Sequence, residues 1–212
     1  MKDEKPKRDL RYCWDTDGVE LRAVEADDGS VKISGYAYRF NSWSEDLGGF
    51  RERIKPGAGQ KALLKSDVRL LYNHDSNTLP LGRTPKTLRL AEDTKGLKFE
   101  GDLPDTQFAR DLAIAIERKD ITGNSFSFLV AEGGDEWKEK EGVASRTISE
   151  FDEFFDIGPV VFPAYDSAKV KVSQRTLENL EKHKTGLSSR SDEGVTALLD
   201  EQANLKIDLL KY

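Results

Sequence analysis

The fold is decided by the stretch ASRTISEFDEFFDIGPVVFPA, residues 144–164. Its alternating apolar and polar side chains indicate a β-strand from Ala144 to Ile157, which Gly158-Pro159 ends. If that strand is continuous, one face carries Phe151, Glu153, Phe155 and Ile157, and the other carries Asp152, Phe154 and Asp156. Acids inside an apolar strand cost free energy unless they have partners, and at most one of Glu153 and Asp156 can belong to a given site.

Other short strands are expected on the N-terminal side of this stretch. Residues 19–40 alternate around an Asp-Asp-Gly-Ser turn, which indicates a hairpin. Further strands are predicted over 68–73, 87–91, 97–103 and 125–131, and one helix, capped by Asp105, between Pro104 and Gly123. About eight short strands and one strong helix favour a mixed α+β, mainly β fold. Because strand-rich chains protect their edges by closing, we expect a small closed or partly closed β-barrel with flanking helices.

Three regions of the chain differ in composition. Residues 1–18 are polar and charged, and they are expected to form a flexible N-terminal arm. Residues 19–175 hold the expected strands and form one domain, which carries the candidate chemistry. Residues 176–212 are expected to form a C-terminal helical appendage, with a polar linker at 185–194.

Charge and hydropathy argue against several classes of partner. The net charge is −6, whereas neutralising nucleic-acid phosphates needs a basic excess, so we expect no nucleic-acid partner. The longest apolar runs are too short to cross a bilayer, and the N-terminus lacks the apolar core of a signal peptide, so we expect no membrane partner. The single cysteine, Cys13, excludes an intrachain disulfide, and a cytosolic location is the default.

The scarcity of histidine and cysteine also narrows the chemistry. With only His74, His183 and Cys13, a zinc site would need mostly carboxylates, which zinc seldom accepts alone, so no metal or other cofactor is expected. Cys13 lies in the charged N-terminal arm, which makes a cysteine peptidase a poor interpretation. His183 lies in the polar segment LENLEKHK, where a solvated side chain is the preferred interpretation.

Two motifs carry candidate catalytic residues. His74 follows an apolar strand in LLYNHDSN, where it can face a cleft, although an ordinary surface histidine in a turn has the same pattern. Ser125 begins the alternating run of TGNSFSF, although Ser125 and Ser127 would also fit the solvent face of a strand with its phenylalanines in the core. A carboxylate from Glu153 or Asp156 could hold one tautomer of the histidine, or it could be a surface acid beside a bend.

Together these motifs resemble a known family. FRERIKPGAGQKALLKSDVRLLYNHDSNTLPLGRT (50–84), TGNSFSF (122–128) and FFDIGPVVFPAY (154–165) are similar, in order and spacing, to the prohead proteases of tailed bacteriophages. The resemblance covers residues 20–172. That family is in turn similar to the herpesvirus assemblins in fold and catalytic arrangement, so the resemblance implies a herpesvirus-protease-like barrel.

The resemblance also implies site residues. The family's serine nucleophile falls on Ser125, its histidine general base on His74, and its third position, which orients the histidine, on Asp156. The chain departs from the family at Gly57-Ala58-Gly59, where relatives commonly carry an aromatic residue after Gly-Ala. It also has Ser127 where relatives often have glycine, which makes Ser127 the second candidate nucleophile. By analogy, the segment 158–164 would contribute to the oxyanion hole.

The function that follows is that of a serine endopeptidase of procapsid maturation. Its expected substrates are the major capsid protein, the scaffold and the chain itself, which it would cut within 185–194, and a homodimer is one assembly that the herpesvirus branch suggests. It would act in the host cytoplasm, inside the assembling procapsid, and be absent from the mature virion. The alternative is a catalytically inactive capsid-assembly or scaffold-associated protein of the same fold.

Overall fold

The computed structural model describes residues 9–13, 21–25, 30–140, 142–161, 176 and 178–182. The chain divides into two compact units, Met1–Val172 and Ser173–Tyr212. In the second unit, the described residues 178–182 are helical. The expected limits of the arm, the domain and the appendage stay predictions, and both His183 and the linker 185–194 lie outside the described residues.

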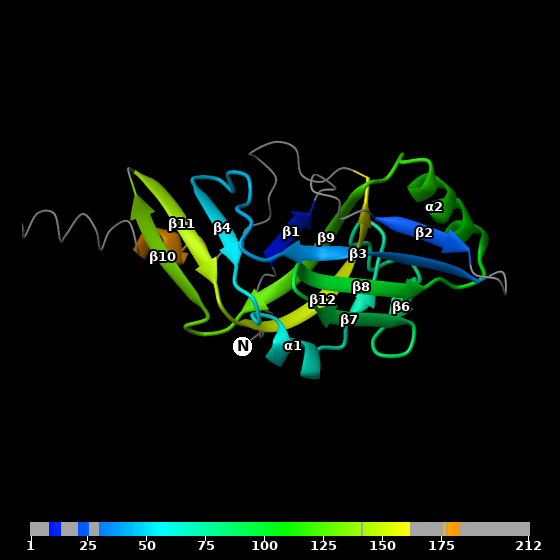
Figure 1. Cartoon of the computed structure of the whole chain (residues 1–212), viewed down its shortest axis with the longest axis horizontal. Coiled ribbons are helices and arrows are strands. Elements are labelled where there is room, and N and C mark those ends of the chain that lie inside the picture. The colour runs from blue at the N-terminus through cyan, green and yellow to red at the C-terminus, as the bar shows by residue number, and fades with distance from the viewer. Residues whose placement is uncertain are drawn as a thin grey trace, which may run out of the picture. The chain divides into compact units, whose positions relative to one another are not determined.

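The first unit is built from three sheets (Figure 1). One sheet has the order β1 (Asp9–Cys13), β9 (Gly123–Val130), β12 (Phe151–Val160), β5 (Arg69–Leu70) and β6 (Gly82–Arg83). A second contains β10 (Asp135–Lys140), β11 (Val143–Ile148) and β4 (Phe50–Ile54). The third contains β2 (Arg22–Glu25), β3 (Val31–Arg39), β8 (Gly96–Asp102) and β7 (Leu88–Glu92). The helices are α1 (Gln60–Lys65) and α2 (Gln107–Glu117).

This architecture confirms the mixed α+β, mainly β class. Within the described residues, however, the three sheets are open, and no strand pairing closes any of them into a barrel. The expected barrel is therefore not confirmed, and the likeness to a herpesvirus protease stays a prediction. The described part of the chain contains no helix that is long and apolar enough to span a membrane.

The single long strand expected over 144–157 is wrong. The chain forms β11 and β12 instead, which are separated at Ser149 and Glu150 and belong to different sheets. Two register shifts interrupt the pairing of β12 with β9, one between Phe151 and Glu153 and one between Phe154 and Asp156. Because each bulge inserts a residue, strict alternation fails, and Phe154 does not share the face of Asp156. Phe154 lies with Phe151 in the core, with ring centroids 4.9 Å apart.

An aromatic cluster fills the space between the five-stranded sheet and β3. Tyr38 on β3 packs against Phe126 with ring centroids 5.3 Å apart, and Phe128 packs against Phe151 at 4.9 Å. These rings lie on one face of β9, so period-two alternation leaves Ser125 and Ser127 on the other face. The core therefore determines which face of β9 carries the serines.

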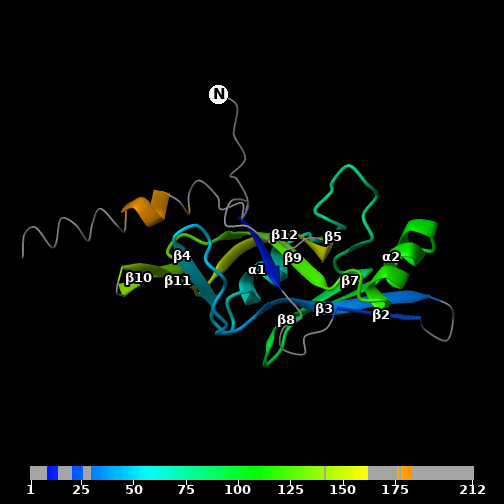
Figure 2. The same cartoon turned by 90° about the horizontal axis from the view of Figure 1, so that it is seen from above.

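The flexible arm expected over 1–18 contains an ordered strand. Residues 9–13 form β1, which pairs antiparallel with residues 124–128 of β9, and for these five residues the expectation of a flexible arm is wrong. Figure 2 shows β1 beside β9, seen from above. Asp9 and Arg11 are buried in spite of their charge. The charges of Asp9 and Arg11 therefore have partners in the structure.

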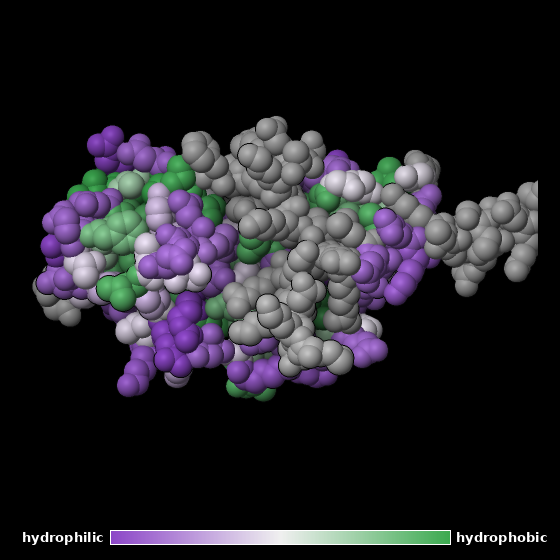
Figure 3. Space-filling model, turned by 180° about the vertical axis from the view of Figure 1, so that it is seen from behind, coloured by the Kyte–Doolittle hydropathy of each residue, from purple (hydrophilic) through white to green (hydrophobic). Residues whose placement is uncertain are grey.

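The helix predicted after Pro104 is present, although Thr106 caps it instead of Asp105. The Thr106 side chain accepts a hydrogen bond from the N–H of Ala109. Leu112 and Ile116 are buried and Phe108 is half-exposed at the edge of Tyr72. On the face seen in Figure 3, apolar residues are scattered among polar ones over the described surface.

Candidate active site

Ser125 lies on β9 between two paired strands. Tyr12 of β1 is its partner on one side and Gly158 of β12 on the other. Its side chain is fully buried, with 0% exposed. The residue is therefore held from both sides, and its hydroxyl is shielded from solvent.

His74 lies in the loop after β5 and is held there by an unusual backbone. Asn73 and His74 both have left-handed conformations, with φ of 51° and 57°. The N–H of Asn73 donates to the carbonyl oxygen of Pro159 at 3.0 Å, and its side-chain oxygen accepts from the N–H of Val161 at 3.0 Å. Asparagine tolerates this conformation better than most residues do, and strained backbone of this kind gathers at functional sites. Asn73 thus fastens the histidine loop to the end of β12.

Gly158 allows this loop to approach β12. The N–H of Leu71 donates to the carbonyl oxygen of Ile157 at 2.9 Å, which continues the parallel pairing of β5 with β12. A Cβ atom on Gly158 would collide with the backbone of Leu71. A glycine inside a strand often marks such a close approach of backbones, so the sequence held a signal for this contact.

The structure brings His74, Ser125 and Asp156 together. His74 Nε2 contacts Ser125 Oγ, and His74 Nδ1 contacts Asp156 Oδ1. Only 15% of the His74 side chain and 7% of the Asp156 side chain are exposed. Hydrogen bonds are electrostatically stronger in such poorly hydrated surroundings than in water.

The two alternative residues are placed elsewhere. Ser127 is buried, and its hydroxyl donates a hydrogen bond to Asp156 Oδ2. The Ser127 hydroxyl is therefore bound to the carboxylate and not to His74. Glu153 is half-buried and pairs in register with Leu129, two residues along β9 from Ser127. Because of the bulge between Phe154 and Asp156, Asp156 is the acid that lies on the same face of the sheet as Ser125 and Ser127.

A buried ionic network lies on the other face of β9. Glu52 of β4 accepts hydrogen bonds from Arg11, including one from Nη2 at 2.9 Å, and from Arg146 Nη1 at 3.2 Å. Asp135 accepts from Arg146 Nε at 2.6 Å, and Asp9 lies 3.7 Å from Arg11 Nη1. Burial alone would raise the pKa of Glu52, but the charges of Arg11 and Arg146 outweigh burial and lower the pKa below its ordinary value.

One contact of Ser125 has no signal in the sequence. Its Oγ donates a hydrogen bond to the carbonyl oxygen of Arg11 at 2.9 Å, across 114 positions of the chain.

Among the described residues, no group of three or more His, Cys, Asp or Glu side chains is arranged to hold a metal ion.

This arrangement has the order of groups that acyl transfer requires. A histidine between a serine hydroxyl and a carboxylate can take the hydroxyl proton as the oxygen attacks a carbonyl carbon, and the carboxylate stabilises the imidazolium that forms. The residues are connected in that order from β9 through the histidine loop to β12.

Comparisons with known proteins point to a family. A family model described as caudovirus prohead serine protease matches residues 17–183. Among solved structures, the bacteriophage T4 capsid assembly protease, gp21, is similar at 10% sequence identity and a TM-score of 0.42, over 74% of this chain and 99% of that one. No curated protein matches the chain at a significant level.

Proposed function

The chain belongs to the caudovirus prohead serine protease family, and from this premise we propose that it is a serine endopeptidase with Ser125 as its nucleophile. His74 is the general base in this proposal, and Asp156 orients His74. The observation that carries the proposal is the unbroken line of contacts from Ser125 Oγ through both ring nitrogens of His74 to Asp156.

The proposed reaction proceeds through an acyl-enzyme. Ser125 Oγ forms a bond to the carbonyl carbon of the scissile peptide while His74 Nε2 takes the hydroxyl proton. His74 then gives that proton to the leaving amine, and a water molecule, activated in the same way, releases the acyl group. Ser127 supports this assignment as a positioning residue, because its hydroxyl donates to the second oxygen of Asp156.

The proposed substrates are capsid proteins, because the family is that of prohead proteases. The enzyme would cleave the major capsid protein and the scaffold inside the assembling procapsid and be absent from the mature virion. We also propose that it cuts itself within 185–194, a stretch of small, polar residues without proline. Assembly as a homodimer remains part of the proposal on the resemblance alone.

A fluorophosphonate probe tests the nucleophile directly. Ser125 Oγ displaces fluoride from phosphorus, and intact mass followed by peptide mapping finds the modified residue. We expect labelling of Ser125 in the wild type, none in Ser125→Ala, and labelling that persists in Ser127→Ala. Labelling of Ser127 in place of Ser125 would reverse the assignment.

Coexpression with the neighbouring capsid protein tests turnover. Wild-type chain is expected to shorten both the capsid protein and its own C-terminal side, and Ser125→Ala is expected to leave both intact. Removing a triad nucleophile lowers kcat by roughly 10⁶-fold in a serine protease without removing a core contact. An intact Tyr212 terminus on the wild-type chain, with the capsid protein cut, would refute self-cleavage alone.

A further inference from the structure

The strand that carries Ser125 is covered by the chain's own N-terminal strand. β1 is the outermost strand of the five-stranded sheet and pairs with β9 over residues 124–128. Without β1, this side of β9 would be a free edge with unpaired backbone groups next to the serine. Extended peptides bind proteins by adding to such an edge as a further strand.

The backbone of β1 meets the nucleophile in a substrate-like position. The carbonyl oxygen of Arg11 accepts a hydrogen bond from Ser125 Oγ at 2.9 Å. A serine has one hydroxyl proton, and the same Oγ contacts His74 Nε2. In a productive complex, Oγ faces the carbonyl carbon and the oxygen points toward other donors. Here the oxygen itself faces Oγ, a geometry that does not favour attack on the carbonyl carbon of Arg11.

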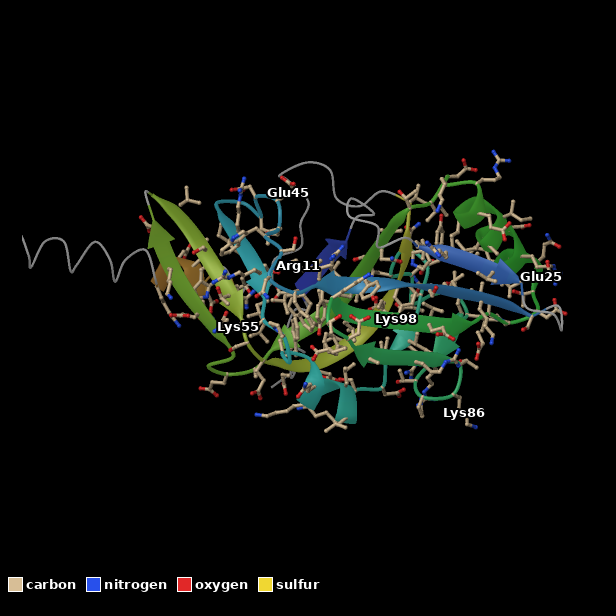
Figure 4. All side chains as sticks on the ribbon, viewed as in Figure 1. Arg11, Glu25, Glu45, Lys55, Lys86 and Lys98 are labelled. Carbon is tan, nitrogen blue, oxygen red and sulfur yellow. The ribbon has the colours of Figure 1, made fainter. Side chains whose placement is uncertain are left out.

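The side chain of Arg11 occupies a built, charged pocket. Its Nε and Nη2 donate to the two carboxylate oxygens of Glu52, and its guanidinium lies 5.3 Å from the ring centroid of Phe128. Only 5% of Arg11 and 3% of Glu52 are exposed. Figure 4 labels Arg11 next to β1 and β4. A bidentate pair of this kind recognises a guanidinium by shape as well as by charge.

The pocket keeps a negative charge when β1 is taken away. β1 supplies Asp9 and Arg11, and among the residues that the structure describes, the other members of the network named above are Glu52, Asp135 and Arg146. Two carboxylates then face one guanidinium. Because a buried, uncompensated carboxylate is costly, the vacated pocket favours a peptide that brings a cation.

We propose that β1 is a built-in substitute for the peptide substrate. The substrate adds to β9 as an antiparallel strand in place of β1, and it puts an arginine side chain on Glu52 where Arg11 now lies. The carbonyl group of that arginine is then the one nearest Ser125, so Glu52 selects a basic residue on the acyl side of the cleaved bond. This inference rests on the proposed function, and it adds the substrate class and the means by which the free enzyme is held inactive.

A reversible disulfide between β1 and β9 tests whether β1 must separate from β9 before Ser125 can react. Cys13 pairs in register with Asn124, and cross-strand neighbours have Cα atoms about 4.5–5.5 Å apart, within the range that a disulfide spans. Asn124→Cys gives the chain a second cysteine on the face of β9 opposite Ser125. We expect the oxidised form to react with a fluorophosphonate at least about tenfold more slowly than the reduced form, because the covered edge can no longer open.

The matched control carries Asn124→Cys together with Cys13→Ser, and its labelling should not depend on the redox state. Equal labelling of oxidised and reduced Asn124→Cys, with the disulfide verified by mass, would overturn the inference and leave Ser125 as the nucleophile. Failure of Ser125 to react in the reduced variant, the control and the wild type would overturn the proposed function itself.

A pair of probes tests the arginine. Two peptidyl diphenyl phosphonates, which lose phenoxide when Ser125 Oγ bonds to phosphorus, differ only in an arginine or norleucine side chain next to the phosphorus. The ratio of their labelling rates cancels any change in the opening of β1. We expect the arginine probe to react about tenfold faster or more with the wild type, and the ratio to fall toward one in Glu52→Gln.

The control for charge alone is Glu100→Gln, an exposed carboxylate on β8, which should keep the wild-type ratio. A ratio near one in the wild type, or an undiminished ratio in Glu52→Gln, would overturn the assignment of Glu52.

Discussion

At the scale of single residues, the candidate site depends on groups that orient other groups. Asp156 contacts His74 with one carboxylate oxygen and accepts from Ser127 with the other. Asn73 holds the histidine loop through one backbone and one side-chain hydrogen bond to the end of β12. In the proposed mechanism these residues do not react, so their loss should lower the rate without abolishing the nucleophile.

We expect Asp156→Asn to lower kcat by roughly 10³- to 10⁴-fold, because an amide favours the wrong tautomer of His74 and does not stabilise the imidazolium. Cleavage of the capsid protein followed over time measures the effect. Glu153→Gln, the matched acid one bulge away on β12, should cleave at the wild-type rate. If the two variants behave alike, the third role belongs to another residue or the enzyme works as a dyad.

Asn73 allows backbone and side-chain effects to be separated. Asn73→Gly can keep the left-handed conformation but loses the side-chain acceptor for the N–H of Val161. Asn73→Ala loses the same acceptor, and its left-handed backbone costs roughly a further 1–2 kcal/mol. The fluorophosphonate labelling rate should therefore decrease from wild type to glycine to alanine. A glycine variant slower than the alanine variant would contradict this account of the loop.

At the scale of elements, the site is the meeting of β9, β12 and the segment after β5. β12 pairs with β9 on one side and with β5 on the other, and the bulge before Asp156 determines which acid faces the serines. The close backbone approach at Gly158 brings the histidine loop against this sheet. The relative positions of these three segments, more than any one side chain, produce the contacts of His74.

Gly158→Ala should push the segment that carries Leu71 away from β12. Overpacking of this kind costs about 1–3 kcal/mol, so we expect a lower melting temperature together with a loss of Ser125 labelling. Circular dichroism during heating and the labelling rate measure the two effects on one sample. Wild-type values for both would show that the backbones have room to separate without harm.

At the scale of the whole molecule, the buried ionic network joins the N-terminal strand to the β10–β11–β4 sheet. Arg11 and Asp9 come from β1, Glu52 from β4, Arg146 from β11 and Asp135 from β10. Interactions between segments so distant in sequence contribute to the stability of the folded unit as a whole, and charged groups make that contribution depend on pH.

The pKa of Glu52 is lower in the folded chain than its ordinary value of 4.5. The stabilisation that its charge provides is therefore fully present above about pH 4.5 and is lost as the pH falls through the folded pKa. We expect Glu52→Gln to lower the free energy of unfolding by about 3–5 kcal/mol at pH 7, because it leaves two buried arginines with one fewer charged partner. Urea unfolding should show that the difference narrows below pH 4.5.

The exposed control Glu100→Gln should change the free energy of unfolding by less than about 1 kcal/mol. A difference between Glu52→Gln and wild type that stays constant down to pH 3 would mean that the charge of Glu52 does not provide the stabilisation.

The sequence by itself determined the local features. Alternation in TGNSFSF separates Ser125 and Ser127 from Phe126 and Phe128, whereas the strand expected over 68–73 is reduced to the two residues of β5, Arg69–Leu70. It did not show that residues 144–157 divide between two sheets, that β12 has bulges, or that residues 9–13 form a strand. Period-two alternation is a local property, whereas strand partners and register depend on packing between distant segments. Only the tertiary structure therefore decided that Asp156 meets His74 and that the carbonyl oxygen of Arg11 accepts a hydrogen bond from Ser125.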